Sequence, residues 1–362
     1  MFIHEHLDWF CFHYDKKEVL SALANVRYYQ GKIIGKMDSL GFFLKEEALL
    51  STLTFDIIKS SEIEGENLNK QEVRSSIARR LGINASGLVN SSRDIDGLVE
   101  MMLDATQNYK SPLTEERLFS WHSCLFPSGW SSGHKIEIGK YRSGEMQVVS
   151  GAMGKERIHY EAPKPERVEK EMLYFLEWLN GETEVDSILK AAIAHFWFIT
   201  IHPFDDGNGR IARAITDMLL SRSDNSTQRF YSMSTQILNE RKEYYMVLEL
   251  SQRGDNDITK WIIWFLNCLN TALISTETML ESILFKAKFW EINSKTIINE
   301  RQKLMLNKVL DGFEGKLTSS KWAKISKCSN DTALRDIQDL ISKNILRKEP
   351  QGGRSTNYEL VK

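Results

Sequence analysis

The segment that most constrains the fold lies at residues 202–213 and has the sequence His-Pro-Phe-Asp-Asp-Gly-Asn-Gly-Arg-Ile-Ala-Arg. Proline disfavours the helical conformation at the residue before it, so a helix arriving from upstream should end at or near His202. Gly207 and Gly209 permit the positive φ angles of a tight turn. The segment therefore predicts a break between two helices, with an imidazole, two carboxylates and two guanidinium groups gathered at the break.

Apolar residues flank this break on both sides. The upstream set is Ile188, Leu189, Ala192, Ile193, Phe196, Trp197 and Ile199, and the downstream set is Ile211, Ile215, Met218 and Leu219. Both sets recur with the period of an α-helix, so two buried helices are predicted, with Asn208 as the cap of the second. His195 lies within the upstream set, and we expect it to pack in the core rather than bind a metal.

The polar groups at the break suit a phosphate-bearing ligand. Backbone N–H groups at the start of a helix attract phosphate oxygens. Arg210 and Arg213 lie three residues apart on one helix face, and arginine matches phosphate geometry better than lysine does. Asp206 could hold Mg²⁺, which usually binds through one or two carboxylates plus substrate phosphates. His202 is expected to be largely neutral at pH 7, as a general base must be.

Each of these parts alone has an ordinary structural explanation. A histidine before proline is usually just a helix-terminal residue, and Gly-Asn-Gly is usually just a turn. Their combination within twelve positions is what indicates attack of a hydroxyl group on a nucleotide phosphate.

The segment resembles the Fic family signature, His-Pro-Phe-x-Asp/Glu-Gly-Asn-Gly-Arg-x-x-Arg, and matches every specified position. The resemblance implies a mostly α fold and transfer of AMP from ATP to a hydroxyl side chain of a target protein, or of the chain itself. It implies that His202 deprotonates this hydroxyl, that Phe204 anchors the loop, and that Asp206 carries Mg²⁺. The implied nucleotide-binding residues of the segment are Asp206, Gly207, Asn208, Gly209, Arg210 and Arg213.

Gly209 bears on the choice of reaction. In the related Doc branch, which phosphorylates its target, a lysine occupies this position. A glycine here favours AMP transfer, while kinase-type transfer and UMP transfer remain the alternatives within the same fold.

A second motif lies far upstream, at Ser60-Ser61-Glu62-Ile63-Glu64-Gly65. It resembles the inhibitory motif Ser/Thr-x-x-x-Glu-Gly/Asn of Fic proteins, which implies that Ser60, Glu64 and Gly65 belong to an inhibitory helix. Glu64 would neutralise Arg213 and place negative charge where a triphosphate must lie. It could also orient a water molecule for the reverse reaction, removal of AMP. The alternative is a solvated acidic helix end, because Glu62, Glu64 and Glu66 form a run of charge.

Two weaker stretches agree with the family. After Gly139-Lys140-Tyr141-Arg142, β-forming residues at 146–149 and 157–160 predict a hairpin. It resembles the flap of Fic proteins, on which a target protein would dock at residues 145–160, with Val149, Ser150 and Gly151 beside the nucleotide. Farther along, Tyr244 and Gln252 are expected at the adenine. The alternatives are an ordinary surface hairpin and ordinary core residues.

The C-terminal segment resembles a winged helix. Helical patterns end near Lys343, and the short β-forming segments around Leu346 and Tyr358 flank a turn at Gln351-Gly352-Gly353-Arg354. From Ile297 onward, 13 Lys and Arg face 8 Asp and Glu, whereas the whole chain has a formal charge of −2. This excess favours an anionic partner such as DNA, although many winged helices make only protein contacts.

Composition sets the outer bounds. The chain has 362 residues, of which 42% are hydrophobic and 27% charged, as in ordinary soluble globular proteins. It has no apolar run of transmembrane length, and early charged residues interrupt any signal peptide. The four cysteines are far apart and have no disulfide or metal-ligand spacing, so a cytoplasmic setting is expected.

The predicted organisation is an N-terminal helical domain at 1–95 that carries the inhibitory helix, a Fic catalytic core with a β-hairpin flap at 96–290, and a winged helix at 297–362. The rival hypothesis is a DNA-binding regulator whose core senses a nucleotide. The intact motif favours an enzyme, because a sensor has no need of His202. A homodimer is as compatible with the sequence as a monomer.

Overall fold

The computed structural model describes residues 1–38, 42–83, 87–131, 133–150, 157–310, 313, 315–349 and 356–361. Within these residues the chain is mostly α-helical, as predicted, and its strands pair only as two-stranded hairpins. None of the described helices has the length and apolar character needed to cross a membrane.

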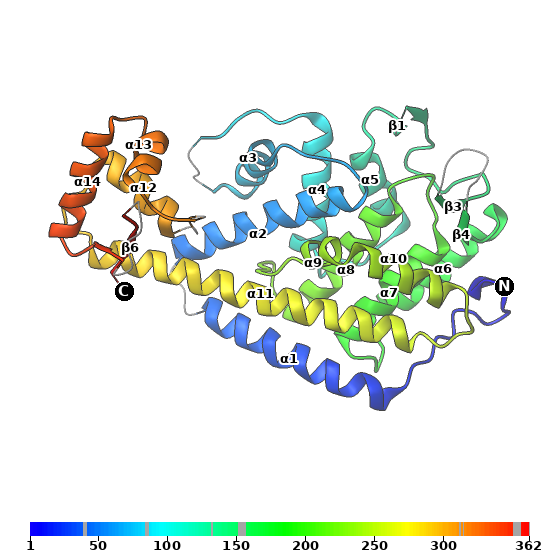
Figure 1. Ribbon diagram of the computed structural model, residues 1–362. Helices are drawn as coiled ribbons and strands as arrows, with labels where there is room; N and C mark the ends of the chain where they lie inside the picture. The colour runs from blue at the N-terminus through cyan, green and yellow to red at the C-terminus, as the bar shows by residue number, and fades with distance from the viewer. Residues whose placement is uncertain are drawn as a thin grey trace. The chain divides into compact units, whose positions relative to one another are not determined.

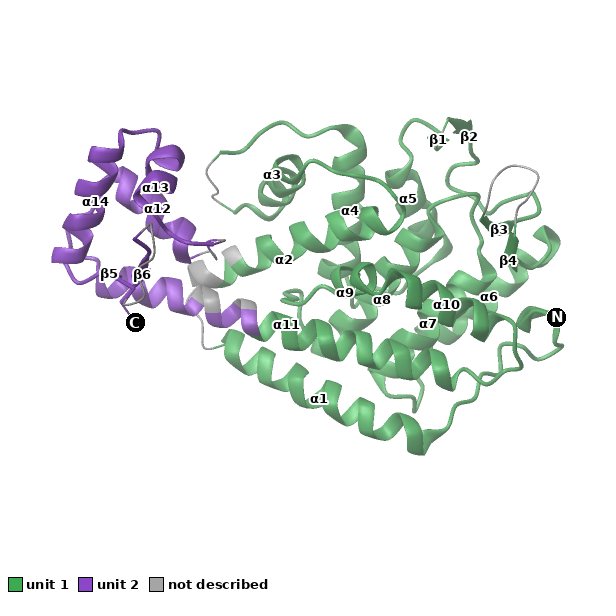
Figure 2. Ribbon diagram, viewed as in Figure 1, with its two compact units in different colours: residues 1–277 green, residues 278–362 purple. Residues whose placement is uncertain are grey.

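The chain divides into two compact units, residues 1–277 and 278–362 (Figure 2). The division falls within helix α11 (Thr259–Ile292), which runs without a break past the expected core limit at residue 290. The predicted domain limits at 95, 290 and 297 stay predictions.

Unit 1 begins with a short 3₁₀ helix and a series of α-helices, and two hairpins interrupt the series. The helices are η1 (Ile3–Glu5), α1 (Lys16–Asp38), α2 (Phe42–Ile63), α3 (Lys70–Leu81), α4 (Arg93–Gln107), α5 (Glu115–Leu125), α6 (Pro165–Asn180), α7 (Ser187–Ile201), α8 (Asn208–Asp224), α9 (Met233–Asn239) and α10 (Arg241–Gln252). The hairpins pair β1 (Trp130–Ser131) with β2 (His134–Lys135) and β3 (Gln147–Ser150) with β4 (Arg157–Glu161).

Helices α7 and α8 pack against each other and form the centre of unit 1 (Figure 1). Every residue of α7 from Ala191 to Ile201 is buried. Because α7 is apolar on all sides, it is stable only when other helices surround it. The break predicted between two buried helices is therefore confirmed, while His202, Asp205 and Asp206 at the break are half-buried.

A buried charge cluster holds α2 near α8. Arg229 forms an ion pair with Asp217 of α8 and lies 4.0 Å from Asp56 of α2. Asp56 also accepts a hydrogen bond of 2.6 Å from Ser232 at the start of α9. Removing one partner from such a cluster would leave a buried charge unpaired, so the cluster fixes the position of α2.

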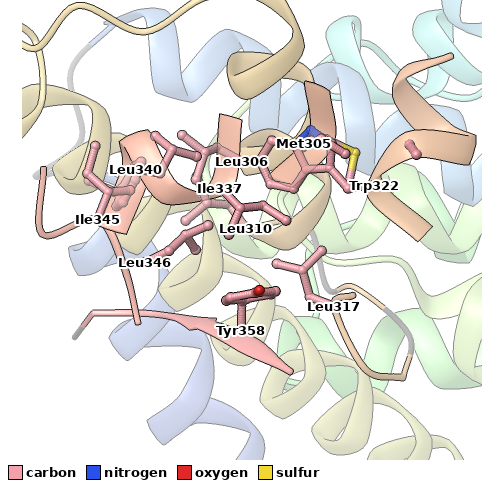
Figure 3. Packing of buried hydrophobic residues seen from close by; sticks show 13 residues of the cluster. Met305, Leu306, Leu310, Leu317, Trp322, Ile337, Leu340, Ile345, Leu346 and Tyr358 are labelled. Atoms are coloured by element: carbon pink, nitrogen blue, oxygen red, sulfur yellow. The ribbon is translucent and has the colours of Figure 1, made fainter. Parts of the chain in front are cut away.

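Unit 2 contains the end of α11, the helices α12 (Glu300–Leu310), α13 (Ser319–Ser326) and α14 (Asn330–Ser342), and the paired strands β5 (Leu346–Lys348) and β6 (Tyr358–Leu360). Three helices followed by a hairpin is the predicted winged-helix order. The aromatic rings of Trp322 and Tyr358 pack with Ile337 and Leu346 in the core of this unit (Figure 3). The predicted turn at Gln351–Arg354 lies outside the described residues.

Candidate active site

His202 follows the last residue of α7 and adopts a left-handed backbone conformation, with φ 52° and ψ 59°. This conformation costs a residue with a Cβ atom about 1–2 kcal/mol, so its surroundings must hold it in place. The prediction that the helix ends at His202 is confirmed.

The ring of His202 is prepared to accept a proton. Its Nδ1 lies 3.1 Å from the carbonyl oxygen of Ile199, an acceptor, so Nδ1 carries the hydrogen and Nε2 is left with a free lone pair. Burial lowers the pKa of His202 to about 4. This effect of burial is larger than the opposing effect of the hydrogen bond to Ile199, which raises the pKa. The imidazole is therefore neutral at physiological pH, as the sequence predicts for a general base.

Buried contacts of Phe204 and Asn208 hold the loop after His202 in place. The ring of Phe204 is fully buried and stacks on His122 with 4.3 Å between ring centroids. Asn208 accepts a hydrogen bond of 3.0 Å from the Phe204 N–H and donates one of 2.7 Å to the Phe204 carbonyl. Phe204 thus lies where an anchor of the loop would lie.

The prediction that Asn208 caps α8 is wrong. Gly207, with φ 83°, occupies the capping position, and no side chain caps the helix there. The Asn208 side chain is already used by the Phe204 backbone. The first N–H groups of α8 therefore keep no side-chain acceptor, which suits an anion-binding helix start.

Gly207 and Gly209 are glycines for different reasons. A Cβ atom at Gly207 would lie 2.9 Å from the Phe126 ring, and the positive φ adds to the requirement. Gly209 lies within α8 at ordinary helical angles, so the prediction that it supplies a positive φ is wrong. A Cβ atom there would lie 2.1 Å from Glu64 Oε1, so the absence of a side chain at Gly209 leaves room for the Glu64 carboxylate.

Asp206 presents a partly exposed carboxylate at the break. Its Oδ1 accepts a hydrogen bond from the Gly207 N–H and lies 4.0 Å from Arg210 Nη2, and its Oδ2 accepts one from Ser131. No cluster of three or more metal-binding side chains occurs among the described residues. One carboxylate beside two arginines nevertheless fits Mg²⁺, which takes its remaining ligands from phosphates and water.

Arg213 is bound by the predicted inhibitory motif. Its guanidinium group is 2% exposed and lies 2.7 Å from Glu64 Oε1. It also donates hydrogen bonds to the hydroxyl and the carbonyl oxygen of Ser60, at 2.8 and 2.9 Å. Gly65, with φ 87°, turns the chain directly after Glu64. Ser60 and Glu64 thus contact Arg213 from about 150 residues away in the sequence.

A second contact between the same segments was not predicted. Glu66 Oε2 lies 2.8 Å from Arg210 Nη1, and the Arg210 guanidinium group lies over the Phe126 ring, 5.0 Å from its centroid. Glu62 instead pairs with Lys59 of its own helix, at 2.6 Å. The acidic run is therefore divided between a local ion pair and the two arginines. Because Gly65 reverses the chain within the run, helical spacing alone does not indicate this division.

The predicted hairpin is confirmed as β3 and β4, with Val149 opposite Ile158. Val149 is 48% exposed. The Ser150 hydroxyl contacts His159 Nε2, and His159 Nδ1 lies 2.6 Å from Glu249 of α10. Gly151 lies outside the described residues. The hairpin is thus tied to α10, while its contact with a nucleotide stays a prediction.

The residues expected at the adenine point into the core. Tyr244 is 2% exposed, and its hydroxyl lies 2.9 Å from His195 Nε2. Gln252 is 5% exposed and donates to Thr200 at 3.2 Å. The accessible ring beside them belongs to Tyr245, which is 40% exposed. Contact of Tyr244 and Gln252 with a base stays a prediction, and their present hydrogen bonds stabilise the core.

A neutral imidazole, a carboxylate and two arginines lie around the start of a buried helix, and a glutamate from the turn after α2 lies against Arg213. This is the arrangement that the resemblance to the Fic family implies. The chain contains a Fic domain: residues 112–220 match the Fic/DOC family. Residues 2–83 match a separate family described as a domain of unknown function, DUF4172. Unit 1 therefore contains both matches.

Relatives carry the same family name. The chain is 25% identical over 248 residues to "Protein adenylyltransferase Fic" of Nematostella vectensis, covering 65% of this chain and 53% of that protein. It is 36% identical over 122 residues to "Protein adenylyltransferase fic-1" of Caenorhabditis elegans, covering 33% of this chain and 21% of that protein. The chain thus spans about half or less of the length of these relatives.

Solved structures share the fold. A Fic family protein from Desulfovibrio desulfuricans G20 covers 96% of this chain and is itself covered to 96%, with a TM-score of 0.55 and 20% identity. Fic-1 from C. elegans covers 73% of this chain and is covered to 74%, with a TM-score of 0.50 and 20% identity. The likeness extends the assignment of the fold to most of the chain.

Proposed function

We propose that this chain is an autoinhibited protein adenylyltransferase, which moves AMP from ATP to a hydroxyl side chain of a target protein or of itself. The observation that carries the proposal is the His202 ring, neutral and with Nε2 free, beside the glycine-rich start of α8 and its two arginines. The names of the relatives from N. vectensis and C. elegans support the same reaction.

The reaction follows from the groups around the break. Nε2 of His202 takes the proton of the incoming hydroxyl, and the hydroxyl oxygen bonds to the α-phosphorus of ATP. The bond from this phosphorus to the oxygen that bridges the α- and β-phosphates breaks, and pyrophosphate leaves. The free N–H groups at the start of α8 and the guanidinium groups of Arg210 and Arg213 stabilise the leaving charge. Mg²⁺, held by Asp206, would neutralise phosphate charge when bound.

Glu64 inhibits this reaction. Its carboxylate fills the space beside Gly209 and neutralises Arg213, so a γ-phosphate would meet a negative charge in place of a free guanidinium group. Removing Glu64 would leave Arg213 buried and uncompensated until a triphosphate binds. In the same position Glu64 could orient a water molecule for removal of AMP, so the proposal includes the reverse reaction.

The proposal assigns the target protein to the flap at residues 145–160, where it would add a strand beside β3. A cytoplasmic setting fits the four cysteines, all of which are free thiols. DNA binding by unit 2 is not part of the proposal, because Asp336 and Asp339 of α14 form ion pairs with Arg301 and Lys343 and so reduce the positive charge that unit 2 offers to an anionic partner.

The test uses labelled ATP and a Glu64→Gly variant. We expect this variant to label itself, or proteins of a host lysate, well above the level of the unmodified chain, because Arg213 becomes available to the nucleotide. Adding His202→Ala to Glu64→Gly should abolish labelling, since the base is lost. Labelling that persists without His202 would contradict the catalytic assignment, and unchanged labelling in Glu64→Gly would contradict the inhibition.

A further prediction concerns Asp206. In the Glu64→Gly background, Asp206→Asn should lose the dependence of labelling on added Mg²⁺, with a fall in rate of about 100-fold, as expected when a developing phosphate charge loses a stabilising group. The matched control is Asp205→Asn, whose carboxylate accepts a hydrogen bond from the Glu137 backbone instead. An unchanged Mg²⁺ titration in Asp206→Asn would assign the metal to other ligands.

A further inference from the structure

Arg142 lies just before the hairpin and is 3% exposed. Its guanidinium group donates hydrogen bonds to three backbone carbonyl oxygens, those of His202 at 2.8 Å, Gly144 at 2.7 Å and Pro163. Its own backbone N–H donates to the carbonyl oxygen of Pro203 at 2.9 Å. Arg142 therefore contacts the first two carbonyl groups after the end of α7, one through its side chain and one through its backbone.

The three carbonyl groups belong to structurally distinct segments. Gly144 precedes β3 and Pro163 follows β4, so these two carbonyl groups mark the two ends of the hairpin. The third belongs to His202. Among the described residues no carboxylate forms an ion pair with Arg142, so the carbonyl dipoles are the groups that compensate its buried charge. The three carbonyl groups therefore hold the guanidinium group in one orientation.

The backbone of His202 needs a contact of this kind. Its left-handed backbone conformation is unfavourable for a residue with a Cβ atom, and the direction of the ring depends on it. A bond from the Arg142 side chain to the His202 carbonyl, together with the bond from the Arg142 backbone N–H to the Pro203 carbonyl, fixes the two peptide planes that follow the His202 Cα atom. The same guanidinium group fixes the ends of the hairpin on which the target is proposed to dock.

We propose that Arg142 is a positioning residue for His202, which holds the ring of the base in register with the flap; this rests on the proposed function. Arginine suits the role because its planar fork donates in three directions at once. Lysine has a single flexible ammonium group and cannot hold three separated carbonyl groups in fixed directions.

The experiment compares Arg142→Ala and Arg142→Lys with Arg222→Ala in the 362-residue chain carrying Glu64→Gly. Arg222 is the matched control, because it also donates to two backbone carbonyl groups, those of Tyr109 at 2.6 Å and Ser111 at 2.9 Å, without touching the loop. Four quantities are measured: the thermal midpoint, kcat, the KM for ATP, and the ¹⁵N NMR signals of the His202 ring, which His202→Ala identifies. Free guanidinium ion is added to Arg142→Ala as a rescue.

We expect both Arg142 variants to lower kcat by about 100-fold, the loss that follows from a displacement of about 1 Å in a catalytic group, with little change in KM. The His202 ring should lose its single Nδ1–H tautomer, and guanidinium ion should restore part of kcat. Arg222→Ala should lower the thermal midpoint without either effect.

Unchanged kcat and unchanged His202 signals in the Arg142 variants would overturn the proposal, and so would an equal loss of kcat in Arg222→Ala. If Arg142→Ala does not fold, Arg142→Lys decides. If the Glu64→Gly chain transfers no AMP, the proposed function fails on its own, and the tautomer of His202 still tests the positioning role.

Discussion

At the scale of single residues, each arginine of the site has its own glutamate. Arg213 is bound by Glu64 and Arg210 by Glu66, and the two carboxylates lie on either side of the turn at Gly65. The two contacts differ in their surroundings, because the Glu64 side chain is 31% exposed and that of Glu66 is 47% exposed. Water screens the outer pair more strongly, so Glu66 should contribute less to inhibition than Glu64 does.

Glu66→Gln tests this second contact. We expect it to raise self-labelling by about two- to fivefold over the unmodified chain, because a partly exposed ion pair contributes about 0.5–1 kcal/mol. The increase should remain below that of Glu64→Gly. The measurement is the initial rate of AMP incorporation from labelled ATP.

The control is Glu62→Gln, two residues before Glu64 on α2. Glu62 pairs with Lys59 and not with either arginine, so its replacement should leave the rate unchanged. Equal effects of Glu62→Gln and Glu66→Gln would mean that net charge, and not the contact with Arg210, controls the rate.

At the scale of elements, the hairpin of β3 and β4 is held by α10. Glu249 contacts His159 at 2.6 Å and Arg157 at 2.9 Å, and Arg253 donates to the carbonyl oxygens of Ile158 and His159. An isolated two-stranded hairpin is only marginally stable in water, so these contacts contribute to its order together with those of Arg142 at its ends.

Glu249→Ala should therefore loosen the hairpin while leaving α7 and α8 intact. We expect amide exchange in residues 147–150 and 157–161 to become faster by about tenfold, since the loss of charge-assisted hydrogen bonds of this kind costs about 1.4 kcal/mol. Hydrogen–deuterium exchange with mass spectrometry measures it. The control is Glu243→Ala, at an exposed position six residues earlier on the same helix. Unchanged exchange in the hairpin would show that other contacts order it.

At the scale of the whole molecule, the core contains histidines whose pKa values are lowered well below the ordinary value by burial. Burial lowers the pKa of His122 to about 4 and that of His195 to about 3, from an ordinary value of 6.5. His202 shares this behaviour. Between these values and 6.5 the unfolded chain binds protons that the folded chain excludes, so the free energy of unfolding falls as the pH falls through this window.

We therefore expect the thermal midpoint to be nearly constant above pH 6.5 and to fall steadily as the pH is lowered from 6.5 to about 4. The loss of stability should reach about 3 kcal/mol for each of the two fully buried rings. His195→Asn should lower the midpoint at pH 7 but flatten its pH dependence, whereas the exposed His134→Asn should change neither. A midpoint independent of pH in this window would contradict the prediction.

Local sequence patterns were sufficient for the helices and the break. The end of α7 at His202 follows from the proline after it, and the burial of α7 and α8 follows from their apolar periodicity, because both effects act within a few residues. The hairpin and the order of elements in unit 2 were predicted on the same basis. The pairing of Glu64 with Arg213 needed more than local physics, and it was expected only because two motifs together resembled one family.

Other features were decided by tertiary structure alone. Tyr244 contacts His195, Glu66 pairs with Arg210, and Arg142 donates to the His202 carbonyl oxygen. In each case a polar side chain contacts a polar group that the packing of the helices has placed beside it. The partners of Tyr244, Glu66 and Arg142 lie 49 to 144 residues away along the chain. The sequence by itself determined which groups gather at the break, and the packing of distant helices determined which of them touch.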